Sequence, residues 1–320
     1  MLGTTKTQIR TTAQRHKAWI EPILTMVGLP SAKAERRIRH ALRFPPRAIV
    51  EITSSPTGGE LAHSMRMGSC GGRDQFAHQL YYNGWPDFEY PLPSLMTAAL
   101  ANDPSGVFVD IGANTGVYSL LAKALRPERS VHAFEPFPPI VSVLTGNIEL
   151  NPFAADIKVV RMAASDQAGI AQLYIPTFEH GLIETSASLS SDFKPQHSQV
   201  VEVKTIRLDE YCSQWTERVG IMKVDVEGAE DRALKGAAEV LASHRPIVFC
   251  EILPSSGTWN RVLETLTGCD YAVAALREDA VDLSSIETQD VDVHNYILYP
   301  RGSGDLVRKL AASANVPCAG

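Results

Sequence analysis

The sequence predicts an α/β fold with a mostly parallel β-sheet that is covered by helices on both faces. From residue 107 onward, apolar segments of strand length alternate with segments of helical character. The apolar segments are nearly continuous, which is typical of strands buried on both faces of a parallel sheet. The composition is that of an ordinary globular protein, since 44% of the 320 residues are hydrophobic and 21% are charged.

Seven apolar segments are expected to form the strands of this sheet. They are residues 107–111, 131–134, 157–162, 221–226, 247–252, 271–276 and 295–299. Helices are expected between them, at about residues 115–125, 138–150, 229–243 and 258–266. A hairpin-like pair is expected to flank a polar loop, at residues 171–175 and 200–206.

The first hundred residues show no clear strand rhythm. Residues 32–42 have a helical pattern, whereas residues 54–59 and 68–72 are rich in turn-forming residues. A helix near residues 92–101 is broken by Asn102-Asp-Pro-Ser-Gly, after which the strands begin. The sequence therefore predicts two parts, a mainly helical extension over residues 1–95 and a domain that contains the sheet over residues 96–320.

Positive charge is concentrated in the first 50 residues, which hold ten Lys or Arg and two acidic residues. This local balance of +8 leaves −14 for the remaining 270 residues, because the whole chain carries −6. Such a basic arm fits a solvated helical face, or contact with an anionic membrane surface, a nucleotide-linked sugar or nucleic acid. Few aromatic residues are interleaved with the basic ones, so no nucleic-acid partner is expected.

Neither a membrane span nor a secretory leader is expected. No apolar run approaches the roughly 20 residues that a membrane-spanning helix requires. The best leader candidate, residues 18–29, is interrupted by Glu21 and Pro22. We therefore expect a cytoplasmic location. The five cysteines are scattered and lack CxxC spacing, which predicts reduced thiols.

The segment Asp110-Ile-Gly-Ala-Asn-Thr-Gly116 lies between a predicted strand and a predicted helix. Glycines at such a turn let the backbone approach a ligand, and the N-terminus of the next helix offers free N–H groups. The pattern is DxGxxxG rather than GxGxxG. A carboxylate there would repel a pyrophosphate but suit the charged amino group of a methionine moiety, which favours S-adenosylmethionine over a dinucleotide. The alternative is a tight turn in which Asp110 only satisfies loop N–H groups.

Glu135 ends the next predicted strand, 25 residues after Asp110. An acidic residue at this place can accept hydrogen bonds from both ribose hydroxyls of a nucleoside. The same residue would suit NAD, so it does not decide between the two cofactors. The alternative is a carboxylate at the surface of the strand end.

Further carboxylates follow two later strands, in Met222-Lys-Val-Asp-Val-Glu-Gly-Ala-Glu230 and at Glu251. If Asp225 and Glu227 both remain extended, their side chains point to the same side. Open α/β sheets bind ligands at the carboxyl ends of their strands, where these residues lie. Helix capping is the structural alternative for Asp225 and Glu227. Glu230 falls in the first turn of a helix, where a negative charge is favourable, and is interpreted as structural.

These motifs together resemble the FkbM family of methyltransferases. The resemblance covers about residues 85–300, and its most specific stretch is KVDVEGAE at residues 223–230. The other matching stretches are residues 107–120, 131–136, 147–151, 159–169, 186–189 and 245–252, with the whole of 222–237. The resemblance implies the Rossmann-like, seven-stranded sheet of the class I methyltransferases. The first 80 or so residues match no known pattern, and in similar enzymes such extensions cap the acceptor site or mediate a homodimer.

The resemblance also implies a set of residues that bind S-adenosylmethionine. Those at the turn, at the second strand and beside the acidic segment are Asp110, Gly112, Asn114, Thr115, Gly116, Glu135, Pro136 and Asp225. Those expected near the adenine are Ala163, Ser165 and Asp166.

Methyl transfer from a sulfonium requires mainly the alignment of donor, methyl group and acceptor, which can contribute about 7–11 kcal/mol. An alcohol acceptor must also lose its proton, which calls for a general base or a metal ion. Asp225, Glu227 and Glu251 could supply either. His180, in the polar loop, is a further candidate base or else a solvated loop residue. No strong metal-ligand spacing is present, so a divalent metal is not favoured.

The favoured function is O-methylation of a hydroxyl on a small molecule, by resemblance a sugar or a natural-product scaffold. N-methylation is the close alternative, and the sequence separates the two poorly. An NAD-dependent oxidoreductase or epimerase should carry GxGxxG and a Tyr-x-x-x-Lys relay, and neither is present. A non-catalytic S-adenosylmethionine-binding protein should have lost the carboxylates at the strand ends, which are all here.

Overall fold

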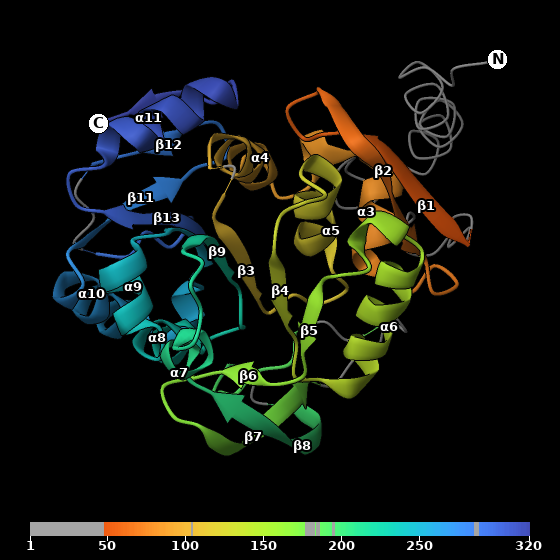
Figure 1. The fold of residues 1–320 in the computed structure, drawn as a ribbon. Helices are drawn as coiled ribbons and strands as arrows, with labels where there is room; N and C mark the ends of the chain where they lie inside the picture. The colour runs from red at the N-terminus through yellow and green to blue at the C-terminus, as the bar shows by residue number, and fades with distance from the viewer. Residues whose placement is uncertain (1–47, 104, 177–182, 184–185, 194–195, 285–287) are drawn as a thin grey trace, which may run out of the picture.

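The computed structural model describes residues 48–103, 105–176, 183, 186–193, 196–284 and 288–320. In this part of the chain, a central sheet has the strand order β14-β12-β11-β13-β10-β9-β3-β4-β5 (Figure 1). Its strands are β3 (Val107–Ile111), β4 (Val131–Phe134), β5 (Lys158–Val160), β9 (Val219–Val224), β10 (Ile247–Glu251), β11 (Tyr271–Leu276), β12 (Val281–Asp282), β13 (Asn295–Pro300) and β14 (Cys318–Ala319).

The seven predicted strands are all present, but the sheet has nine strands, so the expectation of seven is wrong for the sheet as a whole. The two further strands, β12 and β14, contain two residues each and extend the sheet beyond β11. Segments of two residues are too short to leave a recognisable pattern of apolar residues.

Strands β10, β9, β3, β4 and β5 run parallel to one another, whereas β13 lies antiparallel between β10 and β11. The sheet is therefore mixed but largely parallel, as predicted. Because parallel strands end at the same edge, the segments that follow β3, β4, β9 and β10 come together in space.

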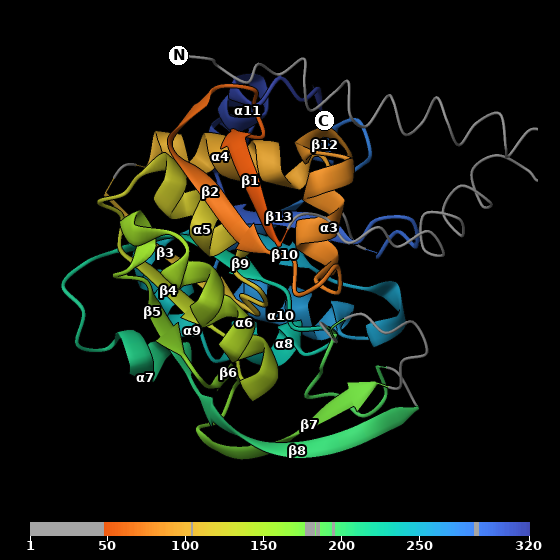
Figure 2. The ribbon, with the colours of Figure 1, turned by 90° about the vertical axis from the view of Figure 1, so that its right-hand side faces the viewer.

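Helices cover both faces of the sheet (Figure 1, Figure 2). Alternate strand residues point to opposite faces, so that Phe108 of β3 belongs to one hydrophobic cluster and Val109 to the other. The helices that share a cluster with Phe108 are α3 (Gln75–Tyr82), α4 (Leu92–Asn102), α5 (Val117–Leu125), α6 (Pro138–Glu149) and α11 (Gly304–Ser313). Those that share a cluster with Val109 are α7 (Leu208–Cys212), α8 (Glu230–Lys235), α9 (Ala238–His244) and α10 (Trp259–Gly268). Three short 3-10 helices are η1 (Trp85–Asp87), η2 (Pro152–Ala154) and η3 (Pro254–Ser256).

The single helix predicted for residues 229–243 is divided into α8 and α9 at Gly236. A Cβ atom at Gly236 would lie 2.0 Å from the carbonyl oxygen of Ser165. The break therefore lets the segment that carries Ser165 pack directly on the helix backbone.

A second, smaller sheet contains the predicted hairpin-like pair. Strands β7 (Gly169–Pro176) and β8 (His197–Ile206) pair antiparallel, and β6 (Ala163–Ala164) pairs in parallel with β8. Figure 1 places this sheet at the lower edge of the molecule, below β5 and α6.

The prediction of a mainly helical extension is wrong for residues 49–68. These residues form an antiparallel hairpin of β1 (Ile49–Ser54) and β2 (Glu60–Gly68), and the turn-rich residues 54–59 are its turn. Met65 and Met67 are buried and alternate with the exposed residues Ser64 and Arg66, which is the two-residue period of a strand. Residues 1–47, with the predicted helix at 32–42 and most of the basic arm, lie outside the described residues.

The hairpin is followed by α3 (Gln75–Tyr82), which Asp74 caps by accepting hydrogen bonds from the backbone N–H of Phe76 and Ala77. Strand β2 packs on α5 and α6, and β1 packs on α3. Buried residues of the hairpin belong to the same hydrophobic cluster as α4 and α5. The described part of the extension therefore shares one core with the sheet. Among the described residues no helix is both long and apolar enough to cross a membrane.

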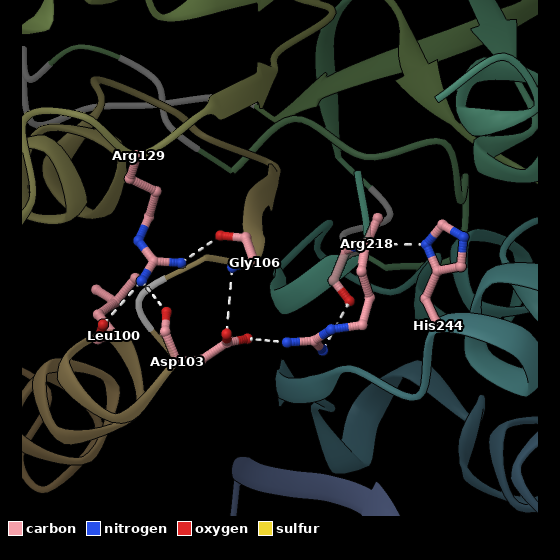
Figure 3. A network of polar contacts seen from close by, with 7 residues as sticks. Leu100, Asp103, Gly106, Arg129, Arg218 and His244 are labelled. Carbon is pink, nitrogen blue, oxygen red and sulfur yellow. Dashed lines mark hydrogen bonds and ion pairs between the residues drawn. The ribbon is translucent and has the colours of Figure 1, made fainter. Parts of the chain in front are cut away.

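A network of polar contacts ties together the amino-terminal ends of β3 and β9 (Figure 3). The Asp103 carboxylate accepts hydrogen bonds from the Gly106 N–H at 3.2 Å and from Nη2 of Arg218 at 2.6 Å. The guanidinium of Arg129 donates to the carbonyl oxygens of Leu100, Asp103 and Gly106. These contacts hold the helix α4 against the start of both strands.

Candidate active site

The predicted cofactor turn connects β3 to α5. Gly112 and Gly116 both have a left-handed backbone, with φ of 79° and 95°. A Cβ atom at Gly112 would lie 1.8 Å from the carbonyl oxygen of Asp225, and one at Gly116 would lie 2.5 Å from a methyl group of Leu144. Only glycine meets both demands, and the turn consequently lies directly against the end of β9.

Asp110 is buried at the end of β3, on the face of the sheet that α5 covers. One carboxylate oxygen, Oδ2, accepts a hydrogen bond from the hydroxyl of Ser119 on α5 at 2.6 Å. The other, Oδ1, is buried and has no hydrogen-bond partner among the described residues. Burial raises the pKa of Asp110, and the ammonium of Lys223 opposes this effect. A buried polar atom of this kind usually binds a ligand or an ordered water molecule.

Glu135 ends β4 and is fixed by two backbone N–H groups. Its Oε2 accepts from Asn114 at 3.1 Å, and its Oε1 accepts from Phe137 at 2.9 Å. Burial raises the pKa of this carboxyl to about 7. Each oxygen can accept a second hydrogen bond, so the residue is suited to bind hydroxyl groups.

A cavity of about 280 Å³ lies at the carboxyl ends of β3, β4, β9 and β10. Its lining residues are Gln75, Phe76, Gln79, Glu89, Ile111, Gly112, Asn114, Glu135, Pro136, Phe137, Ile140, Ala163, Ala164, Leu173, Ala187, Leu189, Asp225, Val226, Glu227 and Glu251. Five of these are acidic, and none is Lys, Arg or His. The wall is therefore suited to neutral or cationic ligands rather than anionic ones.

Most of the predicted site residues meet in this cavity. It brings together eight of them: Gly112, Asn114, Glu135, Pro136, Ala163, Asp225, Glu227 and Glu251. Asp110, Thr115 and Gly116 lie behind it rather than in its lining, and the Thr115 carbonyl oxygen accepts a hydrogen bond from Asn147. His180 lies outside the described residues.

Two residues expected near the adenine lie away from the cavity. Ser165 packs against Gly236, and the carboxylate of Asp166 lies 3.5 Å from the ammonium of Lys235. Their assignment to the cofactor stays a prediction, whereas Ala163 of the same segment does line the cavity.

Lys223 is buried, with 5% of its surface exposed, among the carboxylates at the strand ends. Its ammonium lies 2.6 Å from Oδ2 of Asp225 and 5.0 Å from the centre of the Tyr118 ring. Burial would lower the pKa of Lys223, but Asp225, Asp110 and Glu89 outweigh it and raise that pKa. The ammonium therefore remains charged and fixes Asp225.

Asp225 and Glu251 share a hydrogen bond and divide their charge unequally. Burial would raise the pKa of Asp225, but Lys223 and the hydrogen bond from Glu251 outweigh it and lower that pKa. Burial and the charge of Asp225 raise the pKa of Glu251 to about 10. At neutral pH, Asp225 is therefore the charged member of the pair and Glu251 carries the proton.

The condition that Asp225 and Glu227 both remain extended is not met, because β9 ends at Val224 and Glu227 has a left-handed backbone, with φ of 56°. Both residues nevertheless line the cavity. The carbonyl oxygen of Glu227 accepts a hydrogen bond from the Ser188 hydroxyl at 2.5 Å. Glu230 is buried at the start of α8 and accepts a hydrogen bond from the Gly228 N–H at 2.8 Å. This contact agrees with the structural interpretation of Glu230.

Sequence reasoning missed the wall that the extension contributes, which contains Gln75, Phe76, Gln79 and Glu89. No local motif marks these residues, because α3 and the segment between η1 and α4 reach the cavity only through tertiary packing. Trp85 of the same extension serves that packing. Trp85 is buried and donates from its indole nitrogen to the carbonyl oxygen of Ser54 at 2.8 Å.

Among the described residues, no group of three or more His, Cys, Asp or Glu side chains has an arrangement that could hold a metal ion. The carboxylates of Asp225, Asp110 and Glu89 lie around the ammonium of Lys223.

Comparison with known proteins identifies the part of the chain that contributes most of the cavity lining. A family model described as the methyltransferase FkbM domain matches residues 110–273, which is half of the chain. The 31-O-demethyl-FK506 methyltransferase FkbM of Streptomyces tacrolimicus is 26% identical over 251 residues, covering 71% of this chain and 91% of that protein. The methyltransferase sdnD of Sordaria araneosa is 32% identical over 165 residues, covering 44% of this chain and 64% of that protein.

Two other similar proteins share a smaller part of their length. The 2-O-methyltransferase NoeI of Sinorhizobium fredii is 27% identical over 157 residues, and the match spans 46% of this chain and 63% of that protein. The crystal structure of a methyltransferase FkbM from Methylobacillus flagellatus is 18% identical with a TM-score of 0.40, and covers 61% of this chain and 44% of that one.

Proposed function

This chain belongs to the FkbM methyltransferase family, and we propose that it transfers a methyl group from S-adenosylmethionine to a hydroxyl group of a small molecule. The acceptor is a sugar or a natural-product scaffold. The observation that carries the proposal is one cavity that is lined by Gly112 of the cofactor turn and Glu135 after β4, and also by Asp225 and Glu251. The cavity thus combines groups for an adenosine-containing donor with groups for a polar acceptor.

The donor side fits S-adenosylmethionine in two respects. The missing side chain of Gly112 lets the cofactor turn lie against the Asp225 carbonyl oxygen, and the backbone of Gly112 itself lines the cavity. The buried Oδ1 of Asp110 lacks a partner among the described residues and can accept a hydrogen bond from a charged amino group, directly or through water. Glu135 would hold the ribose hydroxyls, and Ala163 would lie beside the adenine.

When bound, S-adenosylmethionine supplies an already activated methyl group. The protein's own residues have to hold the acceptor oxygen in line with it, exclude water and receive the hydroxyl proton. The lining supplies five carboxyl groups and no cation to the cavity. This charge distribution supports a neutral hydroxyl acceptor, because an anionic acceptor would be repelled.

Two of the similar proteins support oxygen as the methyl acceptor. The Streptomyces protein is named for the 31-O-position of its substrate, and the Sinorhizobium protein is named a 2-O-methyltransferase. An amine would also suit the acidic wall, so product analysis by mass spectrometry and NMR has to distinguish an O-methyl from an N-methyl group.

Ligand-dependent thermal stability tests the proposal without knowledge of the acceptor. S-adenosylhomocysteine at about 100 times its Kd should stabilise the protein by about 2.7 kcal/mol and raise the Tm by several degrees, whereas NAD should leave the Tm unchanged. A shift with NAD and none with S-adenosylmethionine or S-adenosylhomocysteine would contradict the proposal.

A further inference from the structure

Glu89 enters the cavity from the extension and not from the sheet. It lies between η1 and α4, outside residues 110–273 that match the family model. Its backbone is left-handed, with φ of 46°, which is uncommon for a residue other than glycine. Phe88 beside it is fully buried, and the Leu92 N–H donates to the Glu89 carbonyl oxygen at 3.0 Å. The surrounding packing therefore holds this unusual backbone in place, as is common at functional sites.

One oxygen of the Glu89 carboxylate is held by a neighbour. The hydroxyl of Tyr118, on the helix after the cofactor turn, donates to Oε2 at 2.5 Å. Its other oxygen, Oε1, makes no hydrogen bond to any described residue. The carboxylate is thus oriented by one contact and keeps one oxygen for a ligand in the cavity.

The charge of Glu89 is balanced between opposing neighbours. Burial and the carboxylate of Asp225 raise the pKa of Glu89, and burial is the largest effect. The ammonium of Lys223 and the hydrogen bond from Tyr118 lower it, but the pKa is raised overall. Such a carboxylate is a stronger base than an exposed glutamate.

Three other carboxyl groups of the lining are less suited to receive a proton. Glu251 already carries one at neutral pH. Asp225 is held in its charged form by Lys223 at 2.6 Å and by the hydrogen bond from Glu251. Glu135 is bound by two backbone N–H groups beside the cofactor turn.

We propose that Glu89 is the general base of the methyl transfer, an inference that rests on the proposed function. Its Oε1 accepts the proton of the acceptor hydroxyl while that oxygen forms a bond to the methyl carbon. The methyl–sulfur bond breaks with its electron pair going to sulfur, which leaves S-adenosylhomocysteine, and Glu89 afterwards releases the proton to water. Tyr118 is a positioning residue that orients Glu89.

The first test compares Glu89→Gln with Asp87→Asn, a matched control at an exposed acid two residues away. The glutamine keeps an oxygen for the Tyr118 hydroxyl but cannot take up a proton. Calorimetry with S-adenosylhomocysteine measures donor binding. Transfer of a tritiated methyl group from S-adenosylmethionine to a panel of methyl hexopyranosides and to glycerol measures turnover.

Glu89→Gln should bind S-adenosylhomocysteine within about twofold of wild type and lose about a hundredfold in turnover, while Asp87→Asn keeps both. The inference would be overturned if the turnover of Glu89→Gln stays within about tenfold of wild type. It would also be overturned if Glu227→Gln, and not Glu89→Gln, loses about a hundredfold in turnover. If wild type binds no S-adenosylhomocysteine, the proposed function fails, and with it the premise of the inference.

A second readout does not depend on the acceptor and decides the matter if no probe is methylated. In protein with ¹³C-labelled glutamate and bound S-adenosylhomocysteine, the carboxyl signal absent from Glu89→Gln belongs to Glu89. Its shift between about pH 4 and pH 9 should report a charged carboxylate above neutral pH, and Tyr118→Phe should raise its pKa because a hydrogen bond to the charged form is lost. A Glu89 carboxyl that stays protonated at pH 8 would overturn the inference.

Discussion

The two ends of β3 and β9 both carry buried charges, and the cavity with the predicted site residues lies at the carboxyl end. At the amino-terminal end, Arg218 neutralises Asp103, and the Arg129 guanidinium binds three carbonyl oxygens (Figure 3). At the carboxyl end, Lys223 is surrounded by Asp225, Asp110 and Glu89. In the first network, two guanidinium groups donate to carbonyl oxygens and to one carboxylate of the protein, whereas the second has three carboxylates around one ammonium.

This difference teaches that burial and charge do not by themselves mark a functional site. Arg129 is as deeply buried as Asp110. What distinguishes the carboxyl end is an excess of carboxylate oxygens around one ammonium, next to a cavity of about 280 Å³. Perturbed pKa values at such a place indicate function more strongly than an ion pair inside a packed network does.

Arg129→Ala should lower the free energy of unfolding more than any other substitution considered, because it disrupts the network at the amino-terminal ends of β3 and β9. The substitution leaves buried carbonyl oxygens of Leu100, Asp103 and Gly106 without a donor, at about 1–3 kcal/mol each. Urea unfolding should show a loss of about 3 kcal/mol or more. Arg126→Ala, which removes only an exposed bond of 3.5 Å, should stay within about 0.5 kcal/mol of wild type. Equal losses in both variants would contradict the assigned role of the network.

Glu135→Gln should have an intermediate effect, on ligand binding rather than on stability. The pKa of Glu135 is raised to about 7 in the empty cavity, so the carboxyl is largely protonated near pH 6. Hydroxyl donors bind the charged form better, so the affinity for S-adenosylhomocysteine should rise as the pH increases through 7 and then level off. Calorimetry should find about tenfold weaker binding by the variant at pH 8.

The control for this prediction is the pH dependence itself. Burial also raises the pKa of Glu230 to about 7, but Glu230 does not line the cavity. If Glu135 is the group that titrates, Glu135→Gln should show an affinity that does not change between about pH 6 and 8. A pH dependence that persists in the variant would assign the titration to another group.

Asp225→Asn should have the smallest effect on stability and sharpen the contrast with Arg129→Ala. In this variant Asp110 and Glu89 remain beside Lys223, and the asparagine can still accept the hydrogen bond that the Lys223 ammonium donates. The free energy of unfolding should therefore change by only about 1 kcal/mol. The pKa of Glu251 should fall, because the charge of Asp225 is one cause of its elevation. NMR of labelled glutamate measures this shift. Turnover should decrease, and unchanged turnover would remove Asp225 from the catalytic candidates.

Much of the fold was predictable because parallel strands buried on both faces leave continuous apolar runs. For that reason 107–111, 131–134 and 271–276 coincide with β3, β4 and β11. The hairpin β1–β2 was not predicted. Buried methionines alternate with exposed residues in β2, but only at its end, and the polar residues before them show no such alternation. The short strands β12 and β14 carry no sequence signal, because each contains only two residues, which become strands by pairing with neighbouring segments.

The DxGxxxG turn at Asp110, the acid at Glu135 and the acidic segment from Asp225 could be predicted from the sequence alone. Each lies near the end of a strand, and such places are recognisable from the local pattern of residues. Which groups share a cavity, and which of them carry protons, follows from the tertiary structure. Glu89 arrives from a different part of the chain, and the unequal charge of Asp225 and Glu251 follows from burial and from Lys223. The composition of the cavity and the protonation of its carboxyl groups depend on distances between segments and on the exclusion of water. Neither can be derived from the order of the residues.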